Sequence, residues 1–196
     1  MKNKRNFPLL TVLSLLLSIL VIAAIPTEAE GKIYEDTVRL HILANSDTEI
    51  DQALKLEIRD RLIDKYSFLL SSYDKKDDAI YFIEQILPDI EADVNFWISE
   101  LGFAYEAKAS LVTEWYDTRY YEDITMPKGY YTSLKIMIGE AMGQNWWCVM
   151  YPPLCLEVAT DNNLSYGYSR REIALIKNEN YKVKFKILEL ISEMTR

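Results

Sequence analysis

The chain has 196 residues, of which 49% are hydrophobic and 27% charged, so it can bury the core of one folded domain. Only 6 residues are glycine, which excludes a fibrous architecture, and the apolar content excludes a disordered chain. The formal net charge of -8 argues against binding to nucleic acid, because phosphates require a basic surface.

The first residues have the pattern of an export signal. Basic residues at the start precede an apolar run, Leu9–Ile25, and Ala29 ends a Thr-Glu-Ala sequence with the small residues of a cleavage site. Residues 1–29 are therefore predicted to be a signal peptide. Because the run is near the minimum length of a membrane-spanning helix, an uncleaved anchor is the alternative. In both cases residues 30–196 are predicted to form a single extracytoplasmic domain.

A strand and a helix open the predicted domain. Thr37–Ala44 alternates between apolar and polar residues, with Arg39 and His41 on the polar side. Ser46 is the predicted N-cap of the helix, because Glu49 follows at the spacing of a capping box. The helix is expected to continue to about Leu70 and to bury Ile50, Leu54, Ile58, Leu62, Tyr66 and Leu69.

Two further helices are predicted next, at about Lys76–Leu87 and Ile90–Leu101. Pro88 separates them, because proline ends or kinks a helix. Gly102 then stands at the C′ position, where glycine commonly ends a helix.

The hydrophobic period then changes to that of strands. Tyr105–Trp115 alternates as a half-buried strand does, and Met126–Gly129 has proline and glycine where a turn requires them. Further strands are predicted at Tyr130–Ile138 and Trp146–Tyr151, then a loop at Asp161–Gly167 and a last helix through Val183–Met194. This order predicts an α+β fold with a mostly antiparallel sheet of about four strands, packed by three to four helices.

The two cysteines lie on either side of a Tyr-Pro-Pro turn. If Tyr151 and Pro152 are at its centre, Cys148 falls opposite Cys155 on the returning chain. An exported protein meets an oxidising compartment, which favours a disulfide between them. A pair of buried thiols is the alternative, and the sequence leaves both open.

Trp146 and Trp147 are adjacent in the last predicted strand, so their side chains are expected to leave on opposite faces. One is expected to fill the core. The other is expected either under a helix or exposed, where it would be an anchor for a partner.

Few residues indicate catalysis. The single histidine, His41, does not make a histidine-rich metal site, and we expect it to be hydrogen-bonded or solvated. Asp117, Glu122 and Asp123 lie in a tyrosine-rich connection. They are predicted to be loop charges beside aromatic residues that anchor the loop, although a carboxylate pair of a sugar hydrolase is the alternative. No metal and no cofactor are expected.

Four blocks of the sequence together resemble the stage II sporulation protein R family. They are Arg39–Asp60, which begins RLHILANSD, Thr118–Glu140, Asn145–Cys155 and Val183–Leu188. In this order, behind an export signal, they form a specific pattern that covers most of Thr37–Cys155.

The resemblance implies a signalling protein of endospore-forming bacteria. Such a protein is exported from the forespore into the space between the forespore and mother-cell membranes. There it is expected to activate a membrane-embedded aspartic protease of the mother cell, which cuts the precursor of the sigma factor sigma-E. This role requires no catalysis by the protein itself. The alternative from another class is an extracytoplasmic hydrolase that acts on peptidoglycan.

The resemblance supplies no contact residues for this partner. Our candidates are the residues at the start of the first predicted helix, Asn45, Ser46 and Asp47, and the two neighbouring tryptophans, Trp146 and Trp147.

Overall fold

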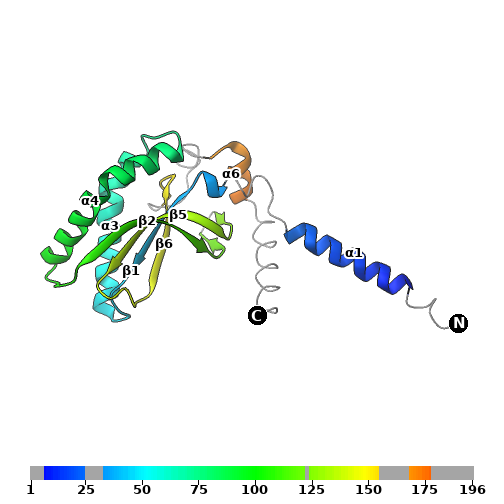
Figure 1. The fold of residues 1–196 in the computed structure, drawn as a ribbon, viewed down its shortest axis with the longest axis horizontal. Helices are drawn as coiled ribbons and strands as arrows, with labels where there is room; N and C mark the ends of the chain where they lie inside the picture. The colour runs from blue at the N-terminus through cyan, green and yellow to red at the C-terminus, as the bar shows by residue number, and fades with distance from the viewer. Residues whose placement is uncertain (1–6, 25–32, 122–123, 155–167, 178–196) are drawn as a thin grey trace.

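The computed structural model describes residues 7–24, 33–121, 124–154 and 168–177 (Figure 1). A four-stranded sheet in the order β2-β5-β1-β6 forms its centre. The strands are β1 (Val38–Leu43), β2 (Ala107–Tyr116), β5 (Gly129–Ile138) and β6 (Asn145–Tyr151). The predicted α+β class and the four main strands are confirmed.

The sheet is mixed. The prediction of a mostly antiparallel sheet is corrected for its central pair of strands, β1 and β5. β2 pairs antiparallel with β5, and β1 pairs antiparallel with β6, but β1 and β5 are parallel. Alternation of apolar and polar residues indicates which face a side chain occupies, but not the direction in which a strand runs. Parallel neighbours need a long crossover, and the helices and β2 between β1 and β5 provide it.

Two long helices cover one face of the sheet (Figure 1). They are α3 (Glu49–Leu70) and α4 (Lys76–Glu100). The two helices predicted on either side of Pro88 are therefore one, with the proline inside it. Ile83, Ile90 and Val94 are all buried in the same core cluster. The apolar side thus continues past the proline, and its burial offsets the backbone hydrogen bond that proline removes.

The buried side of α3 differs in part from the prediction. Leu54, Ile58, Leu62 and Tyr66 are buried as expected, together with Ile63 and Leu70. Ile50 and Leu69, in contrast, are 66% and 41% exposed. Steps of four residues advance about 40° beyond a full helical turn, so a stripe at that spacing leaves the buried face by the time it reaches Ile50.

The opposite face of the sheet has its own cover. A short hairpin, β3 (Arg119–Tyr120) and β4 (Thr125–Met126), lies in the connection between β2 and β5. A short helix, α6 (Arg170–Ile176), and the hairpin segment both contribute side chains to a second apolar cluster on this face. Neither was predicted, although the Ser169 and Glu172 side chains form a complete capping box at the start of α6. The cluster comprises Ile33, Tyr116, Ile124, Met126, Tyr131, Val149, Tyr168 and Ile176.

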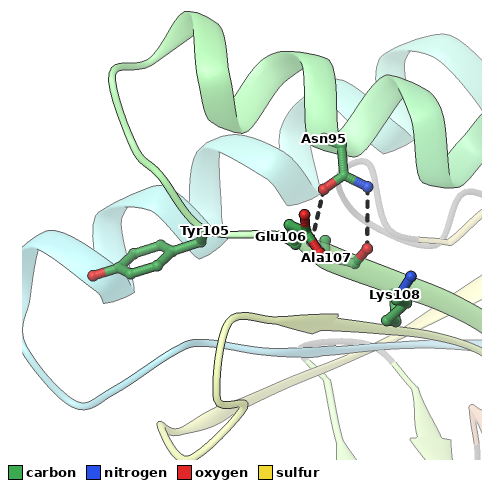
Figure 2. A pocket seen from close by; sticks show the side chains of 5 residues that line it. All are labelled: Asn95, Tyr105, Glu106, Ala107 and Lys108. Carbon is green, nitrogen blue, oxygen red and sulfur yellow. Dashed lines mark hydrogen bonds between the residues drawn. The ribbon is translucent and has the colours of Figure 1, made fainter.

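Side chains of α4 close one end of the outer edge of β2 (Figure 2). Asn95 Nδ2 donates to the carbonyl oxygen of Ala107 at 3.1 Å, and the Ala107 amide donates to Asn95 Oδ1 at 2.7 Å. The Ala109 amide donates to Glu91 Oε2 at 2.9 Å. These groups satisfy the edge of β2 where a neighbouring strand is missing.

The ends of the chain bear on several predictions. α1 (Phe7–Ala24) lies within the predicted export segment, and no helix among the described residues is both long and apolar enough to cross a membrane. The division at residue 29, cleavage and export stay predictions. The predicted loop at Asp161–Gly167 and the last helix, Val183–Met194, lie outside the described residues.

The corrected face of α3 gives a matched pair of predictions. Ile58→Ala is expected to lower the free energy of unfolding by about 2–5 kcal/mol, because Ile58 is fully buried and its truncation leaves a cavity. Ile50→Ala on the same helix is expected to change it by no more than about 0.5 kcal/mol. Urea titration followed by circular dichroism measures both, and equal effects would contradict the orientation of α3.

Candidate functional site

The turn between β1 and α3 is held by one buried carboxylate, that of Asp51. Asn45 Nδ2 and Ser46 Oγ both donate to Asp51 Oδ2, at 2.8 and 2.5 Å. The hydrogen bond from Ser46 is the largest cause that lowers the pKa of Asp51 below its ordinary value. The N-cap of α3 is Thr48, whose side chain accepts from the Asp51 amide. The prediction of Ser46 as the N-cap is thus wrong, because its hydroxyl is committed to Asp51.

The turn also holds the loop that precedes β6, residues 139–144. Asn45 Oδ1 accepts from the amide of Glu140 at 3.0 Å, and the Asn45 carbonyl accepts from the amide of Met142 at 3.1 Å. Asp47 Oδ1 accepts from the amide of Gln144 at 2.6 Å. All three predicted contact residues of this turn therefore make internal hydrogen bonds. Asn45 and Ser46 are half-buried, and only Asp47 is exposed.

Two glycines make this close contact possible. A Cβ atom on Gly139, whose φ is +56°, would lie 2.2 Å from Asn45 Oδ1. A Cβ atom on Gly143 would lie 2.2 Å from the carbonyl oxygen of Ser46. Any side chain at either position would push the loop away from the turn.

Two exposed apolar side chains lie beside the polar turn. Ile50 in the first turn of α3 is 66% exposed, and Met142 in the loop is 81% exposed. We call Asp47, Ile50 and Met142 the turn surface. The hydrogen bonds of Asn45 and Asp47 fix the backbone of the loop relative to the helix start, so the fold sets the relative positions of these three residues.

Trp146 and Trp147 leave β6 on opposite faces, as predicted. Trp146 lies on the helix face, with the Arg59 guanidinium of α3 4.3 Å from its ring centre. Trp147 lies on the other face, stacked on His41 at 3.6 Å between ring centres. Both side chains are half-buried and engaged by neighbours, and their role as contact residues stays a prediction.

The turn after β6 has the predicted register. The amide of Leu154 donates to the carbonyl of Val149 at 3.3 Å, and these residues are one step inside the predicted pair of cysteines. Cys148 is buried and disulfide-bonded. Cys155 lies outside the described residues, so the Cys148–Cys155 pair stays a prediction.

A polar cluster lies on the sheet face away from α3 and α4. His41 is only 3% exposed. Its Nδ1 lies 2.8 Å from Glu114 Oε1, and its Nε2 lies 2.8 Å from Asn145 Oδ1. Lys135 Nζ donates to Glu114 Oε2 at 3.1 Å. The expectation of a hydrogen-bonded histidine is confirmed.

Burial is the dominant influence on the pKa of His41, and it lowers that pKa below 6.5, although Asn145 and Glu114 oppose the shift. Burial raises the pKa of Glu114, but the neighbouring His41 and Lys135 outweigh it, so the net shift is downward. Near neutral pH these shifts favour a neutral imidazole at His41 and an ionised carboxylate at Glu114.

Arg39 is fully buried on the same face. Its guanidinium carbon lies 4.6 Å from the ring centre of Tyr116 and 5.3 Å from that of Tyr131, and Nη2 donates to Tyr121 Oη at 2.9 Å. Within the described residues Nε and Nη1 have no hydrogen-bond partner. The tyrosine rings thus add cation–π stabilisation to the hydrogen bond between Arg39 and Tyr121.

Sequence reasoning missed this cage, because Arg39 alternates with apolar residues and was assigned to the polar side of an ordinary strand. The signal lay in the tyrosines. Tyr116 and Tyr131 have the strand parity that directs both toward the face of Arg39.

The tyrosine-rich connection is described in part. Tyr121 anchors it to the sheet through Arg39, which agrees with the predicted role of the aromatic residues. Asp117 is exposed and accepts from Trp115 Nε1 at 3.2 Å. Glu122 and Asp123 lie outside the described residues, so the hydrolase alternative stays untested. In the described ranges no three histidine, cysteine or carboxylate residues are grouped as a metal site requires.

Comparison with known proteins places these features in a family. A family model described as stage II sporulation protein R matches residues 34–161, which include β1, the turn and all strands of the sheet. The chain belongs to the stage II sporulation protein R family. It is 32% identical over 121 residues to stage II sporulation protein R of Bacillus subtilis (strain 168). The match covers 62% of this chain and 54% of that relative, so the chain spans about half the length of the relative.

No solved structure matches this stage II sporulation protein R family member. The family name places it among sporulation proteins. The turn, the polar cluster and the Arg39 cage all lie within the matched residues.

Two substitutions in the loop of this family member test the contact with the turn. Gly143→Ala is expected to lower the free energy of unfolding by about 1–3 kcal/mol, because its Cβ would clash with the Ser46 carbonyl. Ala141 has a φ of 53°, so Ala141→Gly relieves strain and is expected to leave stability unchanged or raise it by up to about 1 kcal/mol. Thermal unfolding separates the two, and a neutral Gly143→Ala would contradict the close contact.

The lowered pKa of His41 gives a pH dependence. The unfolded chain takes up a proton near pH 6.5, whereas the folded chain does so only at lower pH. The free energy of unfolding is therefore expected to fall as the pH drops from about 7 to about 5. His41→Gln is expected to flatten this slope in urea titrations. An unchanged slope would assign the acid sensitivity to other groups, and Glu114 is expected to add its own loss below pH 4.5.

Proposed function

We propose that this protein is an exported sporulation signal that activates a membrane-embedded aspartic protease of the mother cell by direct contact. That protease would process the precursor of sigma-E. The observation that carries the proposal is the family match over residues 34–161, together with the pattern of an export signal ahead of it. The protein would act from the space between the forespore and mother-cell membranes.

The turn surface is the contact that we propose for this partner. It combines an exposed carboxylate, Asp47, with two exposed apolar side chains, Ile50 and Met142. The hydrogen bonds of Asp51 and Asn45 hold these groups in place before a partner binds. A backbone that is already fixed loses little conformational entropy on binding. A ligand of this kind activates by binding the active state of its receptor more tightly than the inactive state.

Reconstitution tests both the function and the surface. The full chain is added to membranes that contain the protease and the sigma-E precursor, and precursor cleavage is followed by gel electrophoresis. The double variant Ile50→Ser and Met142→Ser is expected to reduce cleavage at least tenfold, because it removes both apolar anchors. Phe68→Ser is the matched control. Phe68 is 78% exposed on the same helix, about 27 Å from Ile50, and its loss is expected to have no effect.

Four outcomes would contradict the proposal in different ways. Absence of cleavage with the folded wild-type chain and a competent protease would reject direct activation. Cleavage by the double variant at the wild-type rate would reject the turn surface alone. Full activation by far fewer protein molecules than protease molecules would indicate catalysis. Loss of activity in a His41→Gln variant that still folds and binds the protease would indicate the same. A parallel arm with reductant tests whether the Cys148 disulfide is required.

A further inference from the structure

β2 is an edge strand, and only part of its outer edge is closed. The Gly139 amide donates to the Glu106 carbonyl, just before β2. Even-numbered residues of β2 therefore direct their backbone groups toward β5. Odd-numbered residues direct theirs outward. Asn95 and Glu91 satisfy the outward groups at Ala107 and Ala109. In the described part of the chain β2 pairs with no strand but β5, so the edge from Leu111 to Trp115 is open.

The open stretch has little of the usual protection against another strand, because its one charged residue, Glu114, is held by His41 and Lys135. It reads Leu-Val-Thr-Glu-Trp, without proline, lysine or a bulge, and rich in residues that favour strands. Trp115 is 50% exposed, and it packs against Tyr130, which is 66% exposed. Leu111 is half-buried. The ends of the stretch therefore present apolar side chains, and both lie on the same face of the strand.

We infer that this edge binds the same edge of a second copy of the chain, in an antiparallel pair with its two-fold axis at Thr113. The axis at the centre of the open stretch pairs every open residue with an open residue. Thr113 then meets its own copy, and Leu111 meets Trp115 of the other copy twice. Glu114 faces Val112 of the other copy. The two Glu114 side chains are diagonal neighbours across the axis, and His41 and Lys135 of each copy hold their carboxylates. Aromatic–apolar and Thr–Thr pairs of this kind stabilise strand pairing.

The capped residues fit the same register. Ala109 falls opposite Asp117 of the second copy, which lies beyond the end of β2 at Tyr116. The Asn95 and Glu91 caps therefore border the paired stretch without being displaced. A five-residue strand pair is small compared with a stable dimer interface, so the association is weak and is best detected by trapping.

Variants of the full chain with one added cysteine beside the native Cys148 and Cys155 test this register by disulfide trapping without reductant. Thr113→Cys is expected to form covalent dimers by itself, because directly opposed residues have Cα atoms about 5.5 Å apart, within the range of a disulfide. Leu111→Cys and Trp115→Cys are each expected to remain monomeric alone and to form a covalent dimer when mixed. Lys108→Cys, exposed on the same strand, is the matched control.

A second variant isolates the backbone contribution. Thr113→Pro is added to both the Leu111→Cys and the Trp115→Cys chains. It removes an outward amide but no hydrogen bond to β5, so the fold is expected to persist. Cross-linking between the two mixed chains is expected to be lost. Thr113→Val in the same chains keeps the amide and the cross-link. The inference is overturned if Thr113→Cys dimerises no faster than Lys108→Cys. It is also overturned if the proline variants still cross-link while circular dichroism shows that they are folded. Failure of excess chain without an added cysteine to reduce the cross-linking would overturn it as well.

Discussion

The carboxylate of Asp51 is the point at which the main parts of this domain are joined. It is buried, and it accepts hydrogen bonds from Asn45 and Ser46 in the turn that connects β1 to α3. Through Asn45 the same network reaches the loop that turns from β5 into β6. The parallel pair β1–β5 and the antiparallel pair β1–β6 therefore meet at one anion. A buried carboxylate is stable only when its oxygens are paired, so strand, helix and loop depend on one another.

The two faces of the sheet are stabilised by different interactions. The helix face is apolar, and α3 and α4 bury it in the manner of an ordinary core. The other face holds polar and charged groups among aromatic rings: the neutral imidazole of His41 stacks on Trp147, and the Arg39 guanidinium lies among tyrosines. A charge in such a setting keeps favourable electrostatics without water. The shape of the second face thus depends on polar geometry more than on the volume of its side chains.

The sequence predicted the elements better than their relations. Periodicity located β1, α3 and all three longer strands that follow, because side-chain alternation reports burial directly. It did not report that β1 and β5 run in parallel, since direction depends on the connection between them. The helix start was misplaced by two residues because Ser46 and Thr48 are both good caps. Only the position of Asp51 distinguishes their tasks. The Arg39 cage required knowledge of which strands are neighbours, which no local pattern contains.

Asn95 has a consequence for how the helix layer is aligned with the sheet. Its amide reproduces the donor and acceptor that one residue of a neighbouring strand would offer to Ala107. The next outward-facing backbone pair on β2 is two residues away, at a distance of about 6.8 Å. Between these positions the strand turns its backbone groups toward β5, and the amide of Asn95 would face only side chains. α4 can therefore form this pair of hydrogen bonds only at discrete positions along β2, two residues apart. Gradual sliding of the helix along the strand would break both hydrogen bonds.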